Sequence, residues 1–318
     1  MLRLRDGRAL GSPLRLTVAG GVDEGLLDEA WSSVTDEFSR VDRAMSRFRP
    51  DSELTDLHRR GGQAPGPSWR LRRGLVAAER ARRLTGGRFD PRVVRALERL
   101  GSPAPAQPWG AGREPEFEPG LPVVRRIARS APLELAAPVD LGGIGKGLAL
   151  RWAARRAAEA LGPSRSGATG FLLEAGGDLV GDGTGGGAPW SVAIEDPAGA
   201  DPPVAAVRLE PGWAVATSSV RLGRWRSPDG RAVHHLIDPL TGEPADAGLL
   251  AVTVAFPDPA WAEVWSKALF VEGAGGIAAL ARRRGLAAWW VAEDGTLAMT
   301  PGGRAMTFWI RAEAPAIA

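Results

Sequence analysis

Two of the chain's three histidines are neighbours, at His234 and His235, in an apolar stretch that ends at Asp238. Imidazole is the usual proton carrier near neutral pH, and a nearby carboxylate can orient it. Adjacent side chains of a strand point to opposite faces, so only one of the two rings can enter a given site. The spacing therefore predicts one histidine that handles protons, with Asp238 near it, and one with a structural role.

A glycine-rich turn with one lysine, DLGGIGKG at 140–147, opens a segment with helical spacing at 144–161. Backbone amides at a helix start, together with an ammonium group, favour the binding of an anion. The turn does not fit a nucleotide P-loop, because Asp140 replaces the first glycine and Gly147 replaces the Ser or Thr that would hold magnesium. We therefore expect an anion site of another kind, with Lys146 as its cation.

Three other segments have some features of ligand-binding loops. The segment 181–186 has the GxGxxG spacing, but a strand rather than a helix is predicted after it, at 190–195, so we expect a hairpin turn there. The segments EAGGD at 174–178 and VATSS at 215–219 bring a carboxylate and hydroxyl groups to strand ends. The first fits an ordinary tight turn equally well, and the second alone is not specific for a ligand.

Lysine occurs only at Lys146 and Lys267, so arginine supplies nearly all of the positive charge. The compact ammonium group and the planar guanidinium group are not interchangeable at a binding site. The two positions are therefore candidates for functional cations, although chance alone is the other explanation.

The composition excludes several classes of site and protein. The 318 residues are 44% hydrophobic, and no apolar run approaches the roughly 20 residues of a membrane span. Without cysteine there is no disulfide or thiolate, so a metal would need oxygen or histidine ligands. A net charge of +3 with interspersed acids does not indicate nucleic-acid binding. The first ten residues lack the apolar middle of a signal peptide, so we expect a cytoplasmic protein without membrane contact.

The hydrophobic spacing predicts an α+β protein with mainly antiparallel strands. Strands and helices come in clusters rather than in strict alternation, which disfavours a doubly wound sheet. Helices are predicted at 23–48, 68–84, 91–100, 144–161, 260–270 and 277–284, and strands at 14–19, 171–173, 190–195, 207–209, 213–217, 233–237 and 250–256.

The segment 101–120 is rich in Pro, Gly and Ala, and we expect it to be a surface excursion. A linker between domains is the alternative. Because the strands on both sides are expected to need each other, we predict a single domain over 1–318.

Taken in order, these motifs resemble the ApbE family of FAD:protein FMN transferases. The resemblance covers nearly the whole chain, and the order and spacing of the motifs are more specific than any one of them. The segments that carry it are LGSPLRLTV near the start, AMSRFRPDSELTDL at 44–57, GGRFDP at 86–91, DLGGIGKG at 140–147, EAGGD at 174–178, ATSS at 216–219, HLIDPLTGEPAD at 235–246 and AEVWSKALFVEG at 262–273.

The resemblance implies a T-fold-like ApbE architecture that binds FAD and cuts its pyrophosphate. The FMN half would move to a Thr or Ser hydroxyl of a partner protein, with release of AMP. His235 matches the family's base, with Asp238 and Lys146 as further catalytic candidates. The oligomeric state stays open. The flavin and phosphate contacts would fall on Leu10, Ser46, Phe48, Asp90, Asp140, Lys146, Gly177, Asp178, Thr217 and His235.

The magnesium site of the family is altered in this sequence. The family holds the ion with an Asp and a Thr at i and i+4 of one helix and with a carbonyl of the glycine-lysine turn; the matching residues here are Glu263, Lys267 and Gly145. A protonated lysine has no lone pair and cannot be a ligand. We expect the Lys267 ammonium where the ion would sit, paired with Glu263; a solvated surface pair is the alternative.

Four further positions differ from the family pattern, namely Phe48 for Tyr, His58 and Glu174 for Asn, and Arg151 for Asp. They change the charge expected around the flavin. The sequence thus predicts an FMN transferase with weak or absent magnesium dependence, and the alternative is a catalytically silent FAD-binding homologue with a lost magnesium site.

Overall fold

The computed structural model describes residues 1–110, 121–126, 132–162 and 164–311, and their contacts define two compact units. Unit 1 consists of Met1–Ser39, Lys146–Arg221 and the described part of Ala247–Ala318. Unit 2 consists of the described parts of Arg40–Gly145 and of Leu222–Asp246. Across the described ranges, no helix combines the length and the apolar character that a membrane crossing requires.

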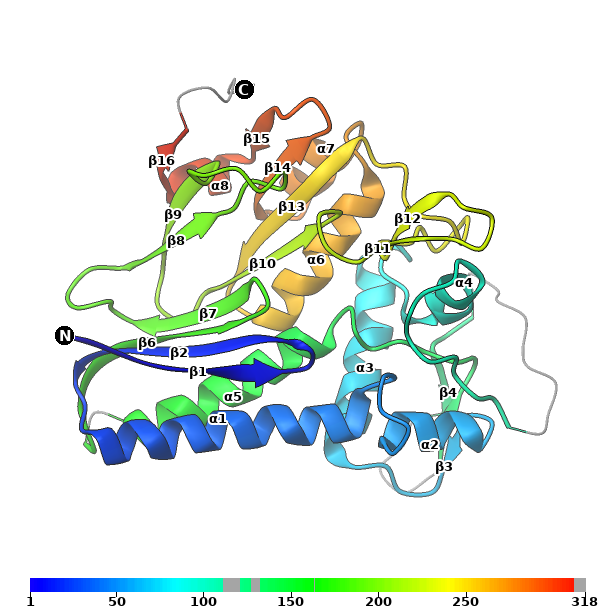
Figure 1. The fold of residues 1–318 in the computed structure, drawn as a ribbon, viewed down its shortest axis with the longest axis horizontal. Coiled ribbons are helices and arrows are strands. Elements are labelled where there is room, and N and C mark those ends of the chain that lie inside the picture. Colours follow the sequence, from blue (N-terminus) through cyan, green and yellow to red (C-terminus); the bar gives the residue numbers. More distant parts are fainter. Residues whose placement is uncertain (111–120, 127–131, 163, 312–318) are drawn as a thin grey trace. The chain divides into compact units, whose positions relative to one another are not determined.

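An eight-stranded antiparallel sheet is the framework of unit 1 (Figure 1). The alternation predicted near the start of the chain buries Leu14, Leu16 and Val18 on one face and leaves Arg15 exposed on the other. In spatial order the strands are β1 (Leu2–Ala9), β2 (Ser12–Gly21), β6 (Gly167–Ala175), β7 (Asp178–Gly183), β10 (Ala214–Ser219), β13 (Leu249–Phe256), β14 (Ala287–Ala292) and β15 (Leu297–Met299).

Helices cover this sheet through apolar stripes. The part of α1 (Glu24–Met45) that belongs to unit 1 buries Leu27, Ala30 and Val34 at helical spacing. Helix α6 (Pro259–Glu272) packs on β10 and β13 (Figure 1). Most of its side chains are buried. Helices α5 (Gly145–Leu161) and α7 (Ile277–Arg283) complete the set. A polar side chain on α6 is therefore held in an apolar setting and needs a partner.

A small antiparallel sheet extends unit 1. It has the order β16 (Thr307–Ile310), β9 (Ala205–Leu209) and β8 (Trp190–Ile194), and α8 (Pro301–Met306) precedes β16. Its core is shared with the large sheet, because Trp190 and Val207 belong to the same buried cluster as Trp289 of β14.

Unit 2 consists of short helices, a three-stranded sheet and a hairpin. The helices are α2 (Glu53–Arg59), α3 (Trp69–Leu84), the 3₁₀ turn η1 (Pro91–Val93) and α4 (Val94–Arg99). The sheet has the order β3 (Gln63–Ala64), β5 (Leu133–Leu135), β4 (Val124–Arg126), and the hairpin pairs β11 (Arg224–Arg226) with β12 (Ala232–His234). The Trp225 indole donates to the Leu100 carbonyl at 2.6 Å, which anchors the hairpin on the end of α4.

A buried histidine lies inside unit 2. His58 is fully buried; its Nε2 accepts from the Val139 amide at 3.2 Å, and its Nδ1 lies 3.1 Å from Gln107 Oε1. Since Nε2 is an acceptor, the proton of the neutral ring is on Nδ1. His58 therefore has a structural role and links α2 to the segments around positions 107 and 139.

The predicted α+β class with antiparallel pairing is confirmed, and the predicted helices and most strands are present with slightly shifted ends. Two local predictions are wrong. The strand expected at 233–237 ends at His234, and the segment 181–186 is no hairpin turn, because β7 and β8 belong to different sheets. The described part of the expected surface excursion, 101–110, is exposed or half-buried except for Gln107, which is 4% exposed and bonds His58. The remainder of that segment, 111–120, lies outside the described residues.

Candidate functional site

Lys146 and Asp178 are at the centre of a polar network in unit 1. The Lys146 Nζ donates to Asp178 Oδ2 at 2.6 Å, and the Thr217 amide donates to Asp178 Oδ1 at 3.1 Å. The Asp178 side chain is 2% exposed, so its charge depends on these donors. Three of the predicted contact residues, from α5, β7 and β10, therefore meet in one unit.

The ammonium group of Lys146 stays charged despite its surroundings. Burial is the largest influence and lowers the pKa of Lys146, but the carboxylates of Asp178 and Glu263 together outweigh it and raise the pKa above its ordinary value. The side chain keeps 25% of its surface exposed. Lys146 is thus a permanent cation that a ligand can reach, as the predicted anion site requires.

Glu263 of α6 joins the same network. It is 1% exposed, and its Oε2 accepts from the Gly147 amide at 2.8 Å while its Oε1 accepts from Lys267 Nζ at 3.2 Å. The pair is not a solvated surface pair, since the carboxylate is inside the protein. This finding favours the predicted inward placement of Lys267 over the surface alternative.

Glycine at position 147 allows this contact. A Cβ on Gly147 would lie 2.5 Å from both the Ala260 Cα and the Pro259 carbonyl oxygen. Only a residue without a side chain lets α5 approach α6 so closely. Gly147, which stands where a P-loop has Ser or Thr, is therefore needed for steric reasons. The close approach also lets its amide donate to Glu263.

The residues at the family's magnesium position do not fit a divalent ion. Both Glu263 oxygens already accept hydrogen bonds, and the protonated Lys267 offers no lone pair. Magnesium prefers several oxygen ligands in octahedral geometry. Among the described residues, no group of three or more His, Cys, Asp or Glu side chains could hold a metal. Gly145, the third predicted position, belongs to unit 2.

Two other departures from the family pattern have local explanations in unit 1. Arg151 donates to Asp258 Oδ1 at 2.5 Å, and Asp258 is the N-cap of α6, so the arginine orients the carboxylate that caps the helix holding Glu263. Glu174 is half-buried; burial raises its pKa, which Arg15 opposes. The extra carboxylate therefore carries its charge less readily than an exposed one.

The hydroxyl groups of the segment 215–219, which lies in β10, are only partly available to a ligand. Ser218 is buried, and its hydroxyl bonds that of Ser266 at 2.8 Å. Thr217 is exposed, and its hydroxyl lies 2.9 Å from that of Thr253. Of these two predicted hydroxyls, Thr217 is the one at the surface of unit 1.

Two tight turns of unit 1 contain predicted contact residues in the left-handed backbone region. Leu10 has φ 49° and the following Gly11 has φ 74°, in the two-residue connection between β1 and β2. Leu10 is the one described residue other than glycine with a positive φ. Such strain costs on the order of 1–3 kcal/mol and is concentrated at functional sites. Gly177 has φ 89° with open space where a Cβ would point, so a ligand can approach its backbone.

In unit 2, Asp140 of the glycine-lysine turn pairs with Arg47. The Arg47 Nε donates to Asp140 Oδ2 at 2.6 Å, and the Gly142 amide donates to Oδ1 at 2.7 Å. The Arg47 side chain is 4% exposed, and its Nη1 is buried without a hydrogen-bond partner among the described residues. Asp140 therefore neutralises a buried guanidinium group. Arg47 was missed by the sequence reasoning, although it adjoins the predicted Ser46.

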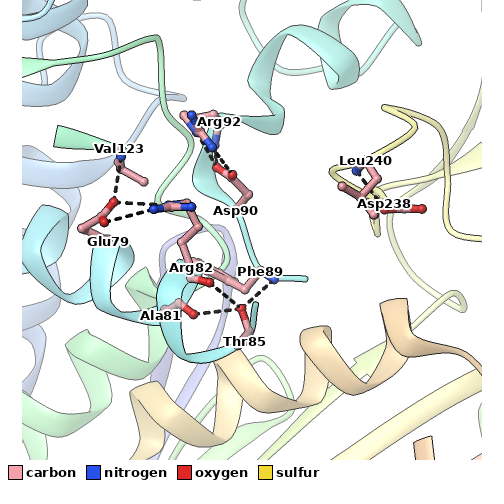
Figure 2. A network of polar contacts seen from close by, with 10 residues as sticks. All are labelled: Glu79, Ala81, Arg82, Thr85, Phe89, Asp90, Arg92, Val123, Asp238 and Leu240. Carbon is pink, nitrogen blue, oxygen red and sulfur yellow. Dashed lines mark hydrogen bonds and ion pairs between the residues drawn. The ribbon is translucent and has the colours of Figure 1, made fainter. Parts of the chain in front are cut away.

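Asp90 is also paired inside unit 2. Figure 2 shows its carboxylate facing Arg92, which donates from Nε at 2.9 Å and from Nη2 at 2.6 Å. The Thr85 hydroxyl accepts from the Phe89 amide at 3.1 Å and donates to the Ala81 carbonyl, which fixes the chain that leads to Asp90 (Figure 2). Asp90 is thus a rigidly positioned acid whose charge Arg92 balances, and no motif in the sequence predicts this partner.

Phe48 presents a large apolar ring at the surface of unit 2. It is 58% exposed, and the Arg47 guanidinium lies 4.8 Å from the ring centre. The Ser46 hydroxyl accepts from the Phe48 amide at 3.3 Å and so holds the turn. An exposed aromatic face of this kind can stack on a planar heterocycle.

The two neighbouring histidines differ in exposure. His234 is half-buried and its Nδ1 accepts from the Leu236 amide at 3.3 Å, whereas His235 is exposed. A Cβ on Gly223 would lie 2.5 Å from His235 Nδ1, so the imidazole rests against the β11 turn where glycine leaves room. Asp238 Oδ1 accepts from the Leu240 amide at 2.9 Å, which stabilises the following turn (Figure 2). His235 is the more exposed of the two rings.

The predicted site residues therefore fall into two groups. Unit 1 joins Lys146, Asp178 and Thr217 with Glu263 and Lys267 in one network. Unit 2 holds Ser46, Phe48, Asp90, Asp140 and His235. Whether both groups meet at one ligand stays a prediction.

Comparisons with known proteins agree with this set of motifs. The sequence model of the ApbE family matches residues 10–290. An FAD:protein FMN transferase of Klebsiella pneumoniae (strain 342) is 29% identical over 306 residues, which cover 91% of this chain and 84% of that protein. The crystal structure of the ApbE protein of Thermotoga maritima shares the fold, with a TM-score of 0.82 at 23% identity, over 96% and 99% of the two chains. The flavinyl transferase ApbE of Pseudomonas stutzeri, in its apo form, has a TM-score of 0.75 at 25% identity, over 96% of each chain.

Proposed function

Because this chain belongs to the ApbE family, we propose that it is a flavin transferase that moves FMN from FAD to a Thr or Ser hydroxyl of a partner protein and releases AMP. The observation that carries the proposal is the network of Lys146, Asp178 and Glu263, in a chain that matches an FAD:protein FMN transferase over 91% of its length. We also propose that the chain forms a single domain and that the protein is located in the cytoplasm.

The chemistry requires a base and a cation. The acceptor oxygen forms a bond to the phosphorus of the FMN half, the bond from that phosphorus to the bridging oxygen breaks, and AMP leaves with the bridging oxygen. His235 takes the hydroxyl proton, since it is the exposed imidazole of the predicted motif. Lys146 stabilises the negative charge that grows on the diphosphate.

The remaining predicted contacts supply binding and orientation. Phe48 offers an exposed ring for stacking, and Gly177 leaves its backbone open to a ligand. Arginines hold Asp90 and Asp140 in fixed positions. Their carboxylates can therefore accept hydrogen bonds from polar groups of the substrate. Catalysis of this kind depends mostly on positioning and electrostatics.

The test is incubation of the purified protein with FAD and a flavoprotein that carries an acceptor threonine. The expected result is AMP in the supernatant and flavin that stays on the acceptor after denaturation. FAD binding without AMP release, with and without added Mg²⁺, would contradict the transfer step. Replacement of the acceptor threonine by alanine in the partner is the matched control and should remove the covalent flavin.

A further inference from the structure

Both lysines of the chain lie beside buried carboxylates in unit 1. The Lys267 Nζ is 3.2 Å from Glu263 Oε1, and the Lys146 Nζ is 2.6 Å from Asp178 Oδ2. The acidic side chains are 1% and 2% exposed, whereas those of Lys267 and Lys146 are 20% and 25% exposed. Each acid is therefore held inside the protein while each ammonium group keeps access to solvent.

The four side chains balance one another without a metal. Two carboxylates and two ammonium groups sum to zero net charge, and the carboxylate of Glu263 also attracts Lys146. A divalent ion at Glu263 would add two positive charges beside Lys267 and would have to displace the Gly147 amide or the ammonium group from an oxygen. Buried charges are stable only when they are matched, so the arrangement opposes metal entry.

We propose that the Lys267 ammonium replaces the divalent cation at the diphosphate, so that the protein binds its dinucleotide free of metal. The identity of the anion rests on the proposed function. A protonated lysine has three N–H donors, and Glu263 occupies one of them. The other two are available to phosphate oxygens, with the neighbouring Lys146 as the second cation. The ligand is thus the unchelated diphosphate ester.

The metal part is tested without flavin, using Mn²⁺ alone as a paramagnetic probe. Titration followed by electron paramagnetic resonance should show no site tighter than about 1 mM on the wild-type protein, given the absence of a ligand set. The double variant Glu263→Asp with Lys267→Thr should gain one site. A tight wild-type site that Glu263→Gln removes would overturn the proposal.

The anion part is tested by FAD titration, followed by flavin fluorescence, in EDTA and in 5 mM Mg²⁺ as the chosen assay conditions. The Kd of the wild-type protein for FAD should differ less than about twofold between EDTA and Mg²⁺, whereas the double variant should bind FAD more tightly with Mg²⁺. Lys267→Met should weaken FAD binding about tenfold or more in EDTA, because a charged donor is lost. Arg165→Met, which removes the exposed ion pair with Glu29, is the matched control and should behave like the wild type.

The outcomes separate the two proposals. A wild-type protein that binds FAD and releases AMP only with Mg²⁺ would overturn the metal-free site and leave the transferase intact. A protein that binds FAD equally well in EDTA but releases no AMP would contradict the transferase and support the metal-free diphosphate site. Absence of FAD binding under every condition would overturn both.

Discussion

The Ala260 Cα lies only 2.5 Å from the point where a side chain on Gly147 would begin, so α5 and α6 can touch only while position 147 lacks a Cβ. This contact brings a backbone amide to a buried carboxylate, Glu263, which in turn holds Lys267. A steric property of one glycine therefore determines where charge is placed in unit 1.

Gly147→Ala should destabilise the protein by about 2–3 kcal/mol, because the added methyl group meets backbone atoms that cannot move aside cheaply. Urea unfolding followed by circular dichroism measures the loss. Gly145→Ala is the matched control, since a Cβ there meets no atom within 4 Å, and it should leave the stability unchanged or slightly higher. Equal stabilities of the two variants would contradict the close approach.

Asp140→Asn should cost about 3–5 kcal/mol, because it removes the negative charge beside the buried Arg47. The measurement is again the free energy of unfolding. The comparison is Glu29→Gln, which breaks an exposed pair with Arg165 and should cost less than about 1 kcal/mol. If Asp140→Asn lowers the free energy of unfolding as little as Glu29→Gln does, Arg47 is not buried as described.

Leu10→Asn should raise the free energy of unfolding by about 0.5–1 kcal/mol, because Asn tolerates a positive φ and Asn-Gly suits a two-residue hairpin turn. If Leu10 contacts the flavin as predicted, the same variant should bind FAD more weakly. Thermal unfolding and flavin titration on one preparation check both effects. A stability below that of the wild type would mean that the leucine is not strained.

His235→Ala should lower the transfer rate by at least about 100-fold while FAD binding persists, because a base acts on the transition state more than on the ground state. AMP release and flavin titration are the two readouts. The neighbouring His234→Asn is the control, since His234 is half-buried and its Nδ1 accepts from the Leu236 amide, and it should retain transfer. Full activity of His235→Ala would show that another group is the base.

The stability should fall as the pH drops below about 6.5, the ordinary pKa of histidine. Burial, followed by the charge of Arg224, lowers the pKa of His234 in the folded protein. The unfolded chain therefore binds a proton that the folded chain resists, and protons shift the equilibrium towards unfolding in this range. Urea midpoints at pH 7.5 and 5.5 should differ less in His234→Asn than in the wild type. Equal differences would exclude a contribution from this ring.

Much of the fold could be predicted because its signals are local. The alternation of Leu14, Leu16 and Val18 and the helical spacing of Leu27, Ala30 and Val34 follow directly from the periods of strands and helices. Strand β7 was missed because its glycines weaken the strand signal, and β1 because its Leu2 and Leu4 are exposed and alternate with arginines.

The site could be predicted only where its partners are close in the chain. Glu263 and Lys267 are one helical turn apart, so their pairing was expected. Arg47 pairs with Asp140 from 93 positions away, and Gln107 reaches His58 across 49 positions, so no local pattern reveals either contact. His235 follows the last residue of β12, and its imidazole lies where a side chain on Gly223 would be. No local sequence pattern predicts this contact either.

The restriction of lysine to two positions limits how the protein surface can be modified. Amine-selective reagents such as succinimidyl esters find no ε-amino group elsewhere in the chain, apart from Lys146 and Lys267. In lysine-rich proteins acylation modifies surface lysines that have no specific partner, but this chain has no such lysines. Any such adduct, apart from one on the α-amino group, falls on a cation that holds a buried acid.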